Sequence, residues 1–577
     1  MRLSELPYYE RWFVAGALIG AVIGLAALSL YYLQYALFSQ LVMHDLLHVN
    51  VNGMTQAQYE ADLGWLVLMP AVLAAAYPIS LLVAMALRTP EVGSDVPVRA
   101  YHRNLRLRPE DAAAPILSSA VTVGLGGSAG LESPAAHAGA ALGQLITRWL
   151  NMTAEDRRRA LAIGLGAGIG AIFKSPFAGA ILSAELLYRR DVEVDVLYPS
   201  FIASSVAYAV YGAATGYSPI MGFYLGPFRP LYLPLMIPLG LLAAGVGMLY
   251  ARAIAGVASA LRPLGSPFLR AAVGGLAAGA IAIAFPEVMG EGFGWVRMAI
   301  AGQAVGLLPI YALIALLPLA KLLATSLTLG SGAKGGVFAP GLDIGAFTGL
   351  AYGLLLHALA PDVVKDAAPF VIVGMLSTFG AASSAPISSM LMTIEMTGSL
   401  TLLPGEMIAL AVAMLAYRGP TLLREQVETR ADSPVHASEV VATVLRRVRV
   451  SEVELRQLYV RHDARASEAL QAVSSSGLLS LPVIDSVRRV LGVVRLVDLR
   501  AASPDDPVIR YLRPEPGHVR PDSTLEEALN LMSRTGARYA IVEDNGVFHG
   551  VVLDEDVRRA FEREALRELM GYGRAEG

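Results

Sequence analysis

The 577-residue sequence contains no cysteine. Disulfides, thiolate metal sites and a cysteine nucleophile are therefore excluded. Charged residues are also scarce: they make up 16% of the chain, against about a quarter of an ordinary soluble domain. Hydrophobic residues make up 55%, the net charge is only −3, and mean hydropathy is positive. This composition predicts a protein that lies mostly within a membrane, and nothing in it points to nucleic-acid binding.

Lysine and arginine are absent between Arg11 and Arg88, a window that holds two apolar runs, roughly 13–40 and 64–87. Each run is long enough to cross a hydrocarbon core of ~30 Å. The segment between them is acidic, whereas the segment 99–108 (RAYHRNLRLR) is rich in arginine. The positive-inside rule therefore predicts a cytoplasmic N-terminus and an external acidic loop. Because no cleavage signature follows the N-terminal segment, we interpret the first run as a retained span.

The composition becomes that of a soluble domain near residue 425. Segments 480–500 and 537–559 each have the pattern of strand, turn, strand and helix start, and each follows an amphipathic stretch. They predict two copies of one unit of about 60 residues. A cytoplasmic tail and N-terminus require an even number of crossings. The expected organisation is a membrane domain over 1–425 with halves at about 12–215 and 228–425, a linker over 426–440, and two repeats over 441–505 and 506–577.

The membrane region contains a hidden duplication. The stretch GSAGLESP ends at Pro134 and the stretch GSGAKGGVFAP ends at Pro340, 206 residues later, and each proline is followed by glycine after five and after nine residues. A second pair of segments begins at Pro176 and Pro386, 210 residues apart, and each has a glutamate nine residues after its proline. Two pairs in the same order at nearly the same offset predict two related halves.

Duplicated halves in transporters often have inverted topology, with broken helices whose N-termini meet near the bilayer midplane. A helix N-terminus carries unpaired N–H groups and about half a positive charge. Glycine next to it lets an anion approach the backbone closely. The duplication therefore favours an anion site held by helix ends, without a fixed cation that would bind the ion too tightly for rapid passage.

Three short motifs then carry a resemblance. The sequence has GSDVP at Gly93–Pro97, GLESP at Gly130–Pro134 and GVFAP at Gly336–Pro340. In this order and spacing they resemble the three filter motifs of the CLC family of chloride channels and chloride/proton antiporters, and the tail resembles a pair of CBS domains. The resemblance implies a polytopic α-helical membrane protein, an inverted repeat of broken and tilted helices followed by a cytoplasmic α/β CBS pair, that forms a homodimer. The filter residues implied are Gly93, Pro97, Gly130, Pro134, Gly336, Ala339 and Pro340.

The resemblance also implies roles for individual residues. Glu132 is the gate, whose carboxylate competes with an anion for the outer site when ionised and swings away when protonated. Ser94 offers its hydroxyl to the central anion, and the N–H groups of Val337 and Phe338 complete that site. The residues by themselves agree, because an unpaired carboxylate within the membrane is costly and marks a functional site. The structural alternative is that Glu132 merely caps a helix start near Pro134.

Three positions depart from the family pattern, and one of them is Asp95, which follows Ser94 where the family usually has glycine. Antiporters of the family usually have an internal proton glutamate where this sequence has Leu186, and a pore tyrosine where our alignment places Leu423 or a neighbour. Chloride/proton antiport is the leading expectation, and a passive voltage- or pH-gated chloride channel is its alternative. A divalent cation channel with a CBS tail is a remote third reading, because such a pore needs rings of carboxylates or carbonyls.

The tail has half of a nucleotide signature. CBS pairs often hold ribose with a Thr or Ser followed three residues on by Asp; here Asp498 and Asp556 are present, but Arg495 and Leu553 replace the hydroxyl residues. Adenine nucleotide binding and a dimer-stabilising or ionic-strength-sensing role both stay open. We otherwise expect no cofactor, no metal, no enzymatic activity and no nucleic-acid partner. The expected substrates are chloride and protons, and the expected location is a prokaryotic inner or plasma membrane with both termini cytoplasmic.

Overall fold

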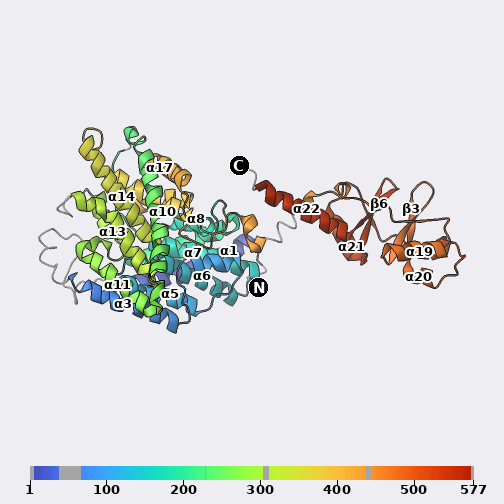
Figure 1. The fold of residues 1–577 in the computed structure, drawn as a ribbon, viewed down its shortest axis with the longest axis horizontal. Helices are drawn as coiled ribbons and strands as arrows, with labels where there is room; N and C mark the ends of the chain where they lie inside the picture. The colour runs from blue at the N-terminus through green and yellow to red at the C-terminus, as the bar shows by residue number, and fades with distance from the viewer. Residues whose placement is uncertain (1–5, 38–65, 228, 303–310, 437–443, 573–577) are drawn as a thin grey trace. The chain divides into compact units, whose positions relative to one another are not determined.

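The protein is described from a computed structural model, which describes residues 6–37, 66–227, 229–302, 311–436 and 444–572. The chain divides into two compact units, Met1–Val435 and His436–Gly577. The first is a helical bundle and the second contains strands as well as helices (Figure 1). The predicted external loop between the first two apolar runs lies outside the described residues.

The helical unit repeats one series of helices. The first series is α1 (Tyr8–Tyr35), α3 (Met69–Ala86), α4 (Asp95–His102), α5 (Glu110–Gly124), α6 (Glu132–Trp149), α7 (Ala154–Ile172), α8 (Pro176–Glu185) and α9 (Leu197–Thr215). The second is α10 (Met236–Ala260), α11 (Pro267–Ala284), α12 (Phe293–Ile300), α13 (Tyr311–Gly330), α14 (Phe338–Leu359), α15 (Ala368–Ser383), α16 (Pro386–Thr397) and α17 (Leu403–Ala416). Helix packing follows the duplication: α1 packs on α9 as α10 packs on α17, and α6 on α7 as α14 on α15.

Six of the described helices are long and apolar enough to cross a membrane. They are Tyr8–Tyr35, Met69–Ala86, Val194–Thr215, Met236–Leu264, Pro267–Ala284 and Phe338–Leu359. Several others are apolar but shorter, among them Ala368–Ser383 and Leu403–Ala416. This mixture agrees with the predicted fold class of broken and tilted helices.

Glycines at repeat-related positions bring the central helices into backbone contact. A Cβ on Gly139 of α6 would lie 2.3 Å from the carbonyl oxygen of Gly164 on α7. In the second half, a Cβ on Gly345 of α14 would lie 2.6 Å from the carbonyl oxygen of Gly374 on α15. Small residues allow such close helix approach in membranes. The glycine five residues after each motif proline thus fixes how each broken helix packs on its neighbour.

Glu185 and Glu395 cap each other's helices. Glu185, the last residue of α8, accepts hydrogen bonds from the backbone N–H groups of Ile387 and Ser388 at the start of α16, at 2.9 and 2.8 Å. Glu395 of α16 accepts the N–H groups at the start of α8, from Phe177 at 2.9 Å and Ala178 at 2.8 Å. Each carboxylate satisfies N–H groups that a helix start leaves unpaired. The second sequence repeat is therefore a reciprocal structural lock between the two halves.

The second unit consists of two similar βα repeats. The first contains β1 (Val460–Arg461), α19 (Ala466–Ser476), β2 (Ser480–Ile484), β3 (Val490–Arg495) and α20 (Leu496–Arg500). The second contains β4 (His518–Val519), α21 (Leu525–Thr535), β5 (Tyr539–Asp544), β6 (Val547–Leu553) and α22 (Asp554–Tyr572). In each three-stranded sheet the middle strand pairs in parallel with the first strand and antiparallel with the third. The predicted strand, turn, strand and helix pattern is confirmed in both repeats.

The segment that joins the units carries short turns. Helical 3₁₀ turns cover Arg430–Asp432 and Pro434–His436, and the division between the units falls at residues 435 and 436. This division lies inside the range 426–440 assigned to the linker from the sequence. Residues 437–443, which include the start of the first predicted repeat, lie outside the described residues.

Candidate anion-binding site

Each of the three motifs starts a helix in the same register. Pro97, Pro134 and Pro340 are the third residues of α4, α6 and α14. Proline is tolerated there because the first helical turn has no intrahelical partner for its N–H groups. Glycine precedes each helix by two residues, at Gly93, Gly130 and Gly336. The motifs therefore produce three helix N-termini, the groups that the sequence predicted for anion binding.

The second and third motifs contact each other directly. The N–H of Gly130 donates to the carbonyl of Gly336 at 3.0 Å, and the N–H of Gly336 donates to that of Gly130 at 2.7 Å. This two-bond antiparallel bridge joins the starts of α6 and α14. Residues 206 positions apart in the sequence thus meet at one point.

The Glu132 carboxylate lies on the N-terminus of α14. Its Oε1 accepts the N–H of Phe338 at 2.7 Å and that of Ala339 at 3.0 Å. The residue is fully buried, and within the described part of the chain Oε2 has no hydrogen-bond partner. The carboxylate therefore occupies a place where backbone N–H groups and a helix dipole favour an anion.

Two glycines make room for this carboxylate. A Cβ on Gly130 would lie 2.1 Å from Oε2 of Glu132, and one on Gly336 would lie 2.3 Å from Oε1. No real Cβ comes so close to another heavy atom. The motif glycines therefore shape the seat of the carboxylate as well as the bridge between the two helices.

Phe338 and Val337 are held by aromatic neighbours. The buried ring of Phe338 packs edge-on against Phe379, with ring centroids 5.2 Å apart. The carbonyl of Val337 accepts the hydroxyl of Tyr250, a fully buried residue of α10, at 3.0 Å. The sequence had not singled out Tyr250, because one tyrosine in an apolar helix carries no distinguishing pattern.

Ser94 lies at the N-cap position of α4 and is buried. Its hydroxyl has no hydrogen-bond partner within the described residues. The neighbouring Asp95 accepts the backbone N–H of Glu425 at 3.2 Å. The acidic residue at this unusual position thus ties α4 to the segment after α17, and the Ser94 hydroxyl stays available for a ligand.

A buried ion pair that the sequence had not singled out lies beside this site. Lys321 of α13 and Asp343 of α14 are fully buried and lie 3.1 Å apart. The lysine also donates to the carbonyls of Val288 and Gly290, at 3.2 and 3.0 Å. Both charges interrupt strongly apolar helices, and charges within a membrane segment usually mark function. That signal was present in the sequence and could have identified them.

Two of the three departures from the family pattern are buried apolar side chains. Leu186 has no exposed surface and Leu423 is 1% exposed. Seven residues after Leu186, the buried Glu193 accepts the hydroxyls of Tyr101 and Tyr188, each at 2.7 Å. Leu423 belongs to a non-helical segment, and the described residues 418–436 around it include no tyrosine.

In the second unit, both predicted nucleotide-site aspartates are paired with arginine. Arg456 contacts Asp556 through two hydrogen bonds, at 2.9 and 2.8 Å, and Arg513 contacts Asp498 in the same way, at 3.1 and 3.2 Å. Arg456 and Asp498 belong to the first repeat, and Arg513 and Asp556 belong to the second, so each pair crosses between the repeats. The repeats are thus joined by two equivalent two-armed ion pairs.

The fold and this site define a membrane protein with two duplicated helical halves, whose helix starts meet at a candidate anion site, and a tail of two βα repeats. A sequence model of the family described as voltage gated chloride channel matches residues 71–418, and the CBS domain matches residues 450–505 and 508–563. The chain therefore belongs to the voltage gated chloride channel family, as the CLC resemblance indicated.

Individual relatives agree with this assignment. An uncharacterized protein of Methanocaldococcus jannaschii is 26% identical over 307 residues, which cover 53% of this chain and 74% of that protein. The H(+)/Cl(−) exchange transporter ClcA of Citrobacter koseri is 29% identical over 308 residues, covering 51% of this chain and 63% of the transporter. A slow cyanobacterial Cl−/H+ antiporter has a similar fold, with a TM-score of 0.61 and 22% identity over 72% of this chain and 96% of the antiporter. At the family level the function is anion transport and not an enzymatic reaction.

Proposed function

We propose that this protein exchanges chloride for protons and that Glu132 is the moving gate. The observation that carries the proposal is the seat of the Glu132 carboxylate on the N–H groups of Phe338 and Ala339. A carboxylate and a chloride ion need the same partners, and one helix start cannot serve both at once. Occupation by Glu132 therefore closes the site to an anion.

Protonation reverses this competition. A neutral carboxyl has lost the charge that the α14 dipole attracts, so its hold on the two N–H groups weakens. Chloride then takes the vacant helix start. When the anion leaves, the carboxyl loses its proton and returns to its seat. One proton is thus carried for each opening of the gate. We place the central anion between the Ser94 hydroxyl and the N–H groups of Val337 and Phe338.

Flux from reconstituted vesicles tests the proposal. A chloride gradient across a vesicle that contains the protein should drive protons in the opposite direction, against their own gradient. Chloride flux without proton movement would support the channel alternative, which the apolar Leu186 at the internal proton position favours. Absence of chloride flux would refute both. Family membership favours anion transport over the divalent cation channel.

We further propose that the protein is a homodimer in a prokaryotic inner or plasma membrane, with both termini in the cytoplasm. The six long apolar helices support insertion in a bilayer. The charge asymmetry between the acidic segment after α1 and the arginine-rich segment 99–108 supports the orientation. Light scattering of the purified protein, corrected for bound detergent, measures the oligomeric state; the mass of a single chain would refute the dimer.

For the tail we propose a module without a resident cofactor, closed by the Arg456–Asp556 and Arg513–Asp498 pairs. A ribose would have to displace a two-armed guanidinium from each aspartate. Such charge-assisted pairs are stronger than the neutral hydrogen bonds that ribose hydroxyls make. Isothermal titration calorimetry of the purified protein with ATP should detect no binding. Saturable binding at micromolar ATP would overturn this proposal.

A further inference from the structure

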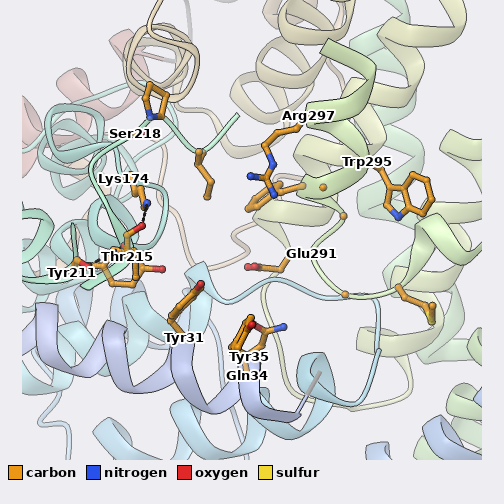
Figure 2. Close-up of a pocket in the computed structure, with 17 residues that line it drawn as sticks. Tyr31, Gln34, Tyr35, Lys174, Tyr211, Thr215, Ser218, Glu291, Trp295 and Arg297 are labelled. Carbon is orange, nitrogen blue, oxygen red and sulfur yellow. Dashed lines mark hydrogen bonds between the residues drawn. The ribbon is translucent and has the colours of Figure 1, made fainter. Parts of the chain in front are cut away.

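A cavity of about 460 Å³ lies beside the gate. Its wall includes Tyr31, Gln34 and Tyr35 from the C-terminal end of α1, the end that the charge pattern places outside the membrane. Two basic side chains, Lys174 and Arg297, and one acidic side chain, Glu291, also line it. Figure 2 shows Glu291 projecting into the cavity between Arg297 and Tyr31. The cavity is thus an outer chamber whose described lining contains one carboxylate, that of Glu291.

Glu291 also touches the element that carries the gate. Its Oε1 accepts the backbone N–H of Leu131, the residue before Glu132, at 3.2 Å. Glu291 is partly exposed, whereas Glu132 is fully buried. The Oε2 atom of Glu132, which has no hydrogen-bond partner among the described residues, is also buried. A proton that arrives from the chamber therefore meets Glu291 before it reaches the gate.

The loop that carries Glu291 is held in place by α14, the helix whose N-terminus binds the Glu132 carboxylate. Lys321 holds the carbonyls of Val288 and Gly290 and is paired with Asp343 of α14. On the other side, a Cβ on Gly292, which has φ +86°, would collide with the Asp343 carboxylate. The loop that carries Glu291 is thus clamped to the same helix whose first N–H groups hold Glu132.

The charged groups around Glu291 lie on different sides of the loop that carries it. Lys321 and Asp343 neutralise each other on the inner side of the loop. Lys174 donates to the carbonyls of Thr215 and Gly216, at 2.9 and 2.7 Å, at the wall of the chamber. Among the described residues, the other groups that face Glu291 are Arg297 and the hydroxyls of Tyr31 and Tyr211 on the chamber side, and Glu132 on the buried side. Two neighbouring carboxylates repel when both are ionised, so this pair favours holding one shared proton.

We propose that Glu291 is the outer proton carrier of the exchange cycle, passing protons between the chamber and Glu132. This inference rests on the proposed function. The O–H bond of a protonated Glu291 breaks, and an O–H bond forms at Oε2 of Glu132, directly or through one water. Glu291 is left ionised and takes a new proton from the solvent in the chamber. One proton moves and no electrons are exchanged; the reverse sequence releases a proton.

The test is Glu291→Gln in the reconstituted full-length protein. Glutamine keeps an oxygen that can accept the Leu131 N–H but cannot carry a proton. Proton-coupled chloride transport driven from the outer side should fall about a hundredfold or more, the lower end of what a positioned proton-transfer group contributes. Its dependence on external pH should flatten, and Glu291→Asp should recover part of both. An unchanged rate and pH profile in Glu291→Gln would overturn the inference.

The double variant with Glu132→Gln separates proton transfer from structure. A gate that cannot ionise has no use for a proton carrier, so Glu132→Gln and Glu132→Gln/Glu291→Gln should pass chloride at the same rate. A double variant that is tenfold slower would show that Glu291 supports the pore structurally, and would overturn its role as carrier. Failure of the proposed function looks different: the unmodified protein would move no protons, or Glu132→Gln would leave coupling intact.

Discussion

The Oε1 atom of Glu132 lies 2.7 Å from the backbone nitrogen of Phe338, and the two residues occupy equivalent positions in the duplicated halves, 206 residues apart. Each is the first residue of a helix and precedes the motif proline by two. One half supplies the carboxylate, and the other supplies the helix start that holds it. The motifs GLESP and GVFAP differ at three of their five positions. In the proposed function, the exchange of Glu132 for Phe338 is the difference that gives one half a gate and the other half its seat.

Alanine at Gly336 should displace the Glu132 carboxylate and strain the backbone bridge to Gly130. Its Cβ would fall on the Glu132 carboxylate, which would lose its two backbone hydrogen bonds. Hydrogen bonds to a charged group contribute about 1.5–3 kcal/mol each, so occupancy of the seat should fall at least about tenfold. We expect the ratio of protons to chloride moved by vesicles to drop while chloride flux persists.

Gly245 of α10 offers the matched control. A Cβ at this position meets open space, and alanine suits a helix interior better than glycine by about 1 kcal/mol. Gly245→Ala should therefore transport as the unmodified protein does. If both variants lost coupling equally, the loss would come from any added methyl group in the helical unit and not from displacement of the Glu132 carboxylate.

Single cysteines can establish the orientation, because the chain has none of its own. Tyr35 is 44% exposed at the end of α1, and the side chain of Arg103 is 61% exposed after α4. On intact cells, a membrane-impermeant maleimide should label Tyr35→Cys, and it should label Arg103→Cys only after the cells are opened. The opposite labelling pattern would invert the topology and would move the chamber of Glu291 to the cytoplasmic side.

The reciprocal caps should matter for stability and not for transport. Replacing Glu395 by alanine leaves the N–H groups of Phe177 and Ala178 without their carboxylate. Loss of a cap costs about 1 kcal/mol, with a range of about 0.5–2. We expect a lower temperature of unfolding in detergent. The proton-to-chloride ratio of the folded fraction should be unchanged, and a changed ratio would argue for a direct role in proton movement.

The pH dependence of the tail follows from its ion pairs. The hydrogen-bonded Arg513 lowers the pKa of Asp498. A lowered pKa in the folded state means that the pair contributes fully above the ordinary carboxyl value of about 3.9, and that its contribution disappears as the pH falls through the lowered value. Because the pair is partly exposed, its contribution is small and screened by salt.

Limited proteolysis of the tail can measure this effect. Between pH 7 and pH 5 the rate of cleavage should stay constant, and Arg513→Ala should be cleaved faster than the unmodified protein throughout that range. High salt should reduce the difference between the two proteins. Equal cleavage rates at low salt would show that the pair does not hold the two repeats together.

Much of this arrangement was predictable from the sequence because it depends on periodic or repeated features. The tandem strands of the tail follow from alternating patterns, and the paired halves follow from the spacing after Pro134 and Pro340. The reciprocal capping by Glu185 and Glu395 did not follow, since a glutamate at a helix end does not reveal which helix start it reaches. The chamber around Glu291 did not follow either, because its wall comes from α1, α9 and α12, which are brought together only by packing.

The most direct test of the account is the number of protons moved per chloride in vesicles, compared between the unmodified protein and Glu132→Gln. Vesicles loaded with chloride and placed in a low-chloride medium should take up protons as chloride leaves, so the external pH should rise without any imposed pH gradient. In Glu132→Gln, chloride should still leave and the external pH should not change. A variant that moves protons and chloride in the same ratio as the unmodified protein would contradict the assignment of Glu132 as the gate.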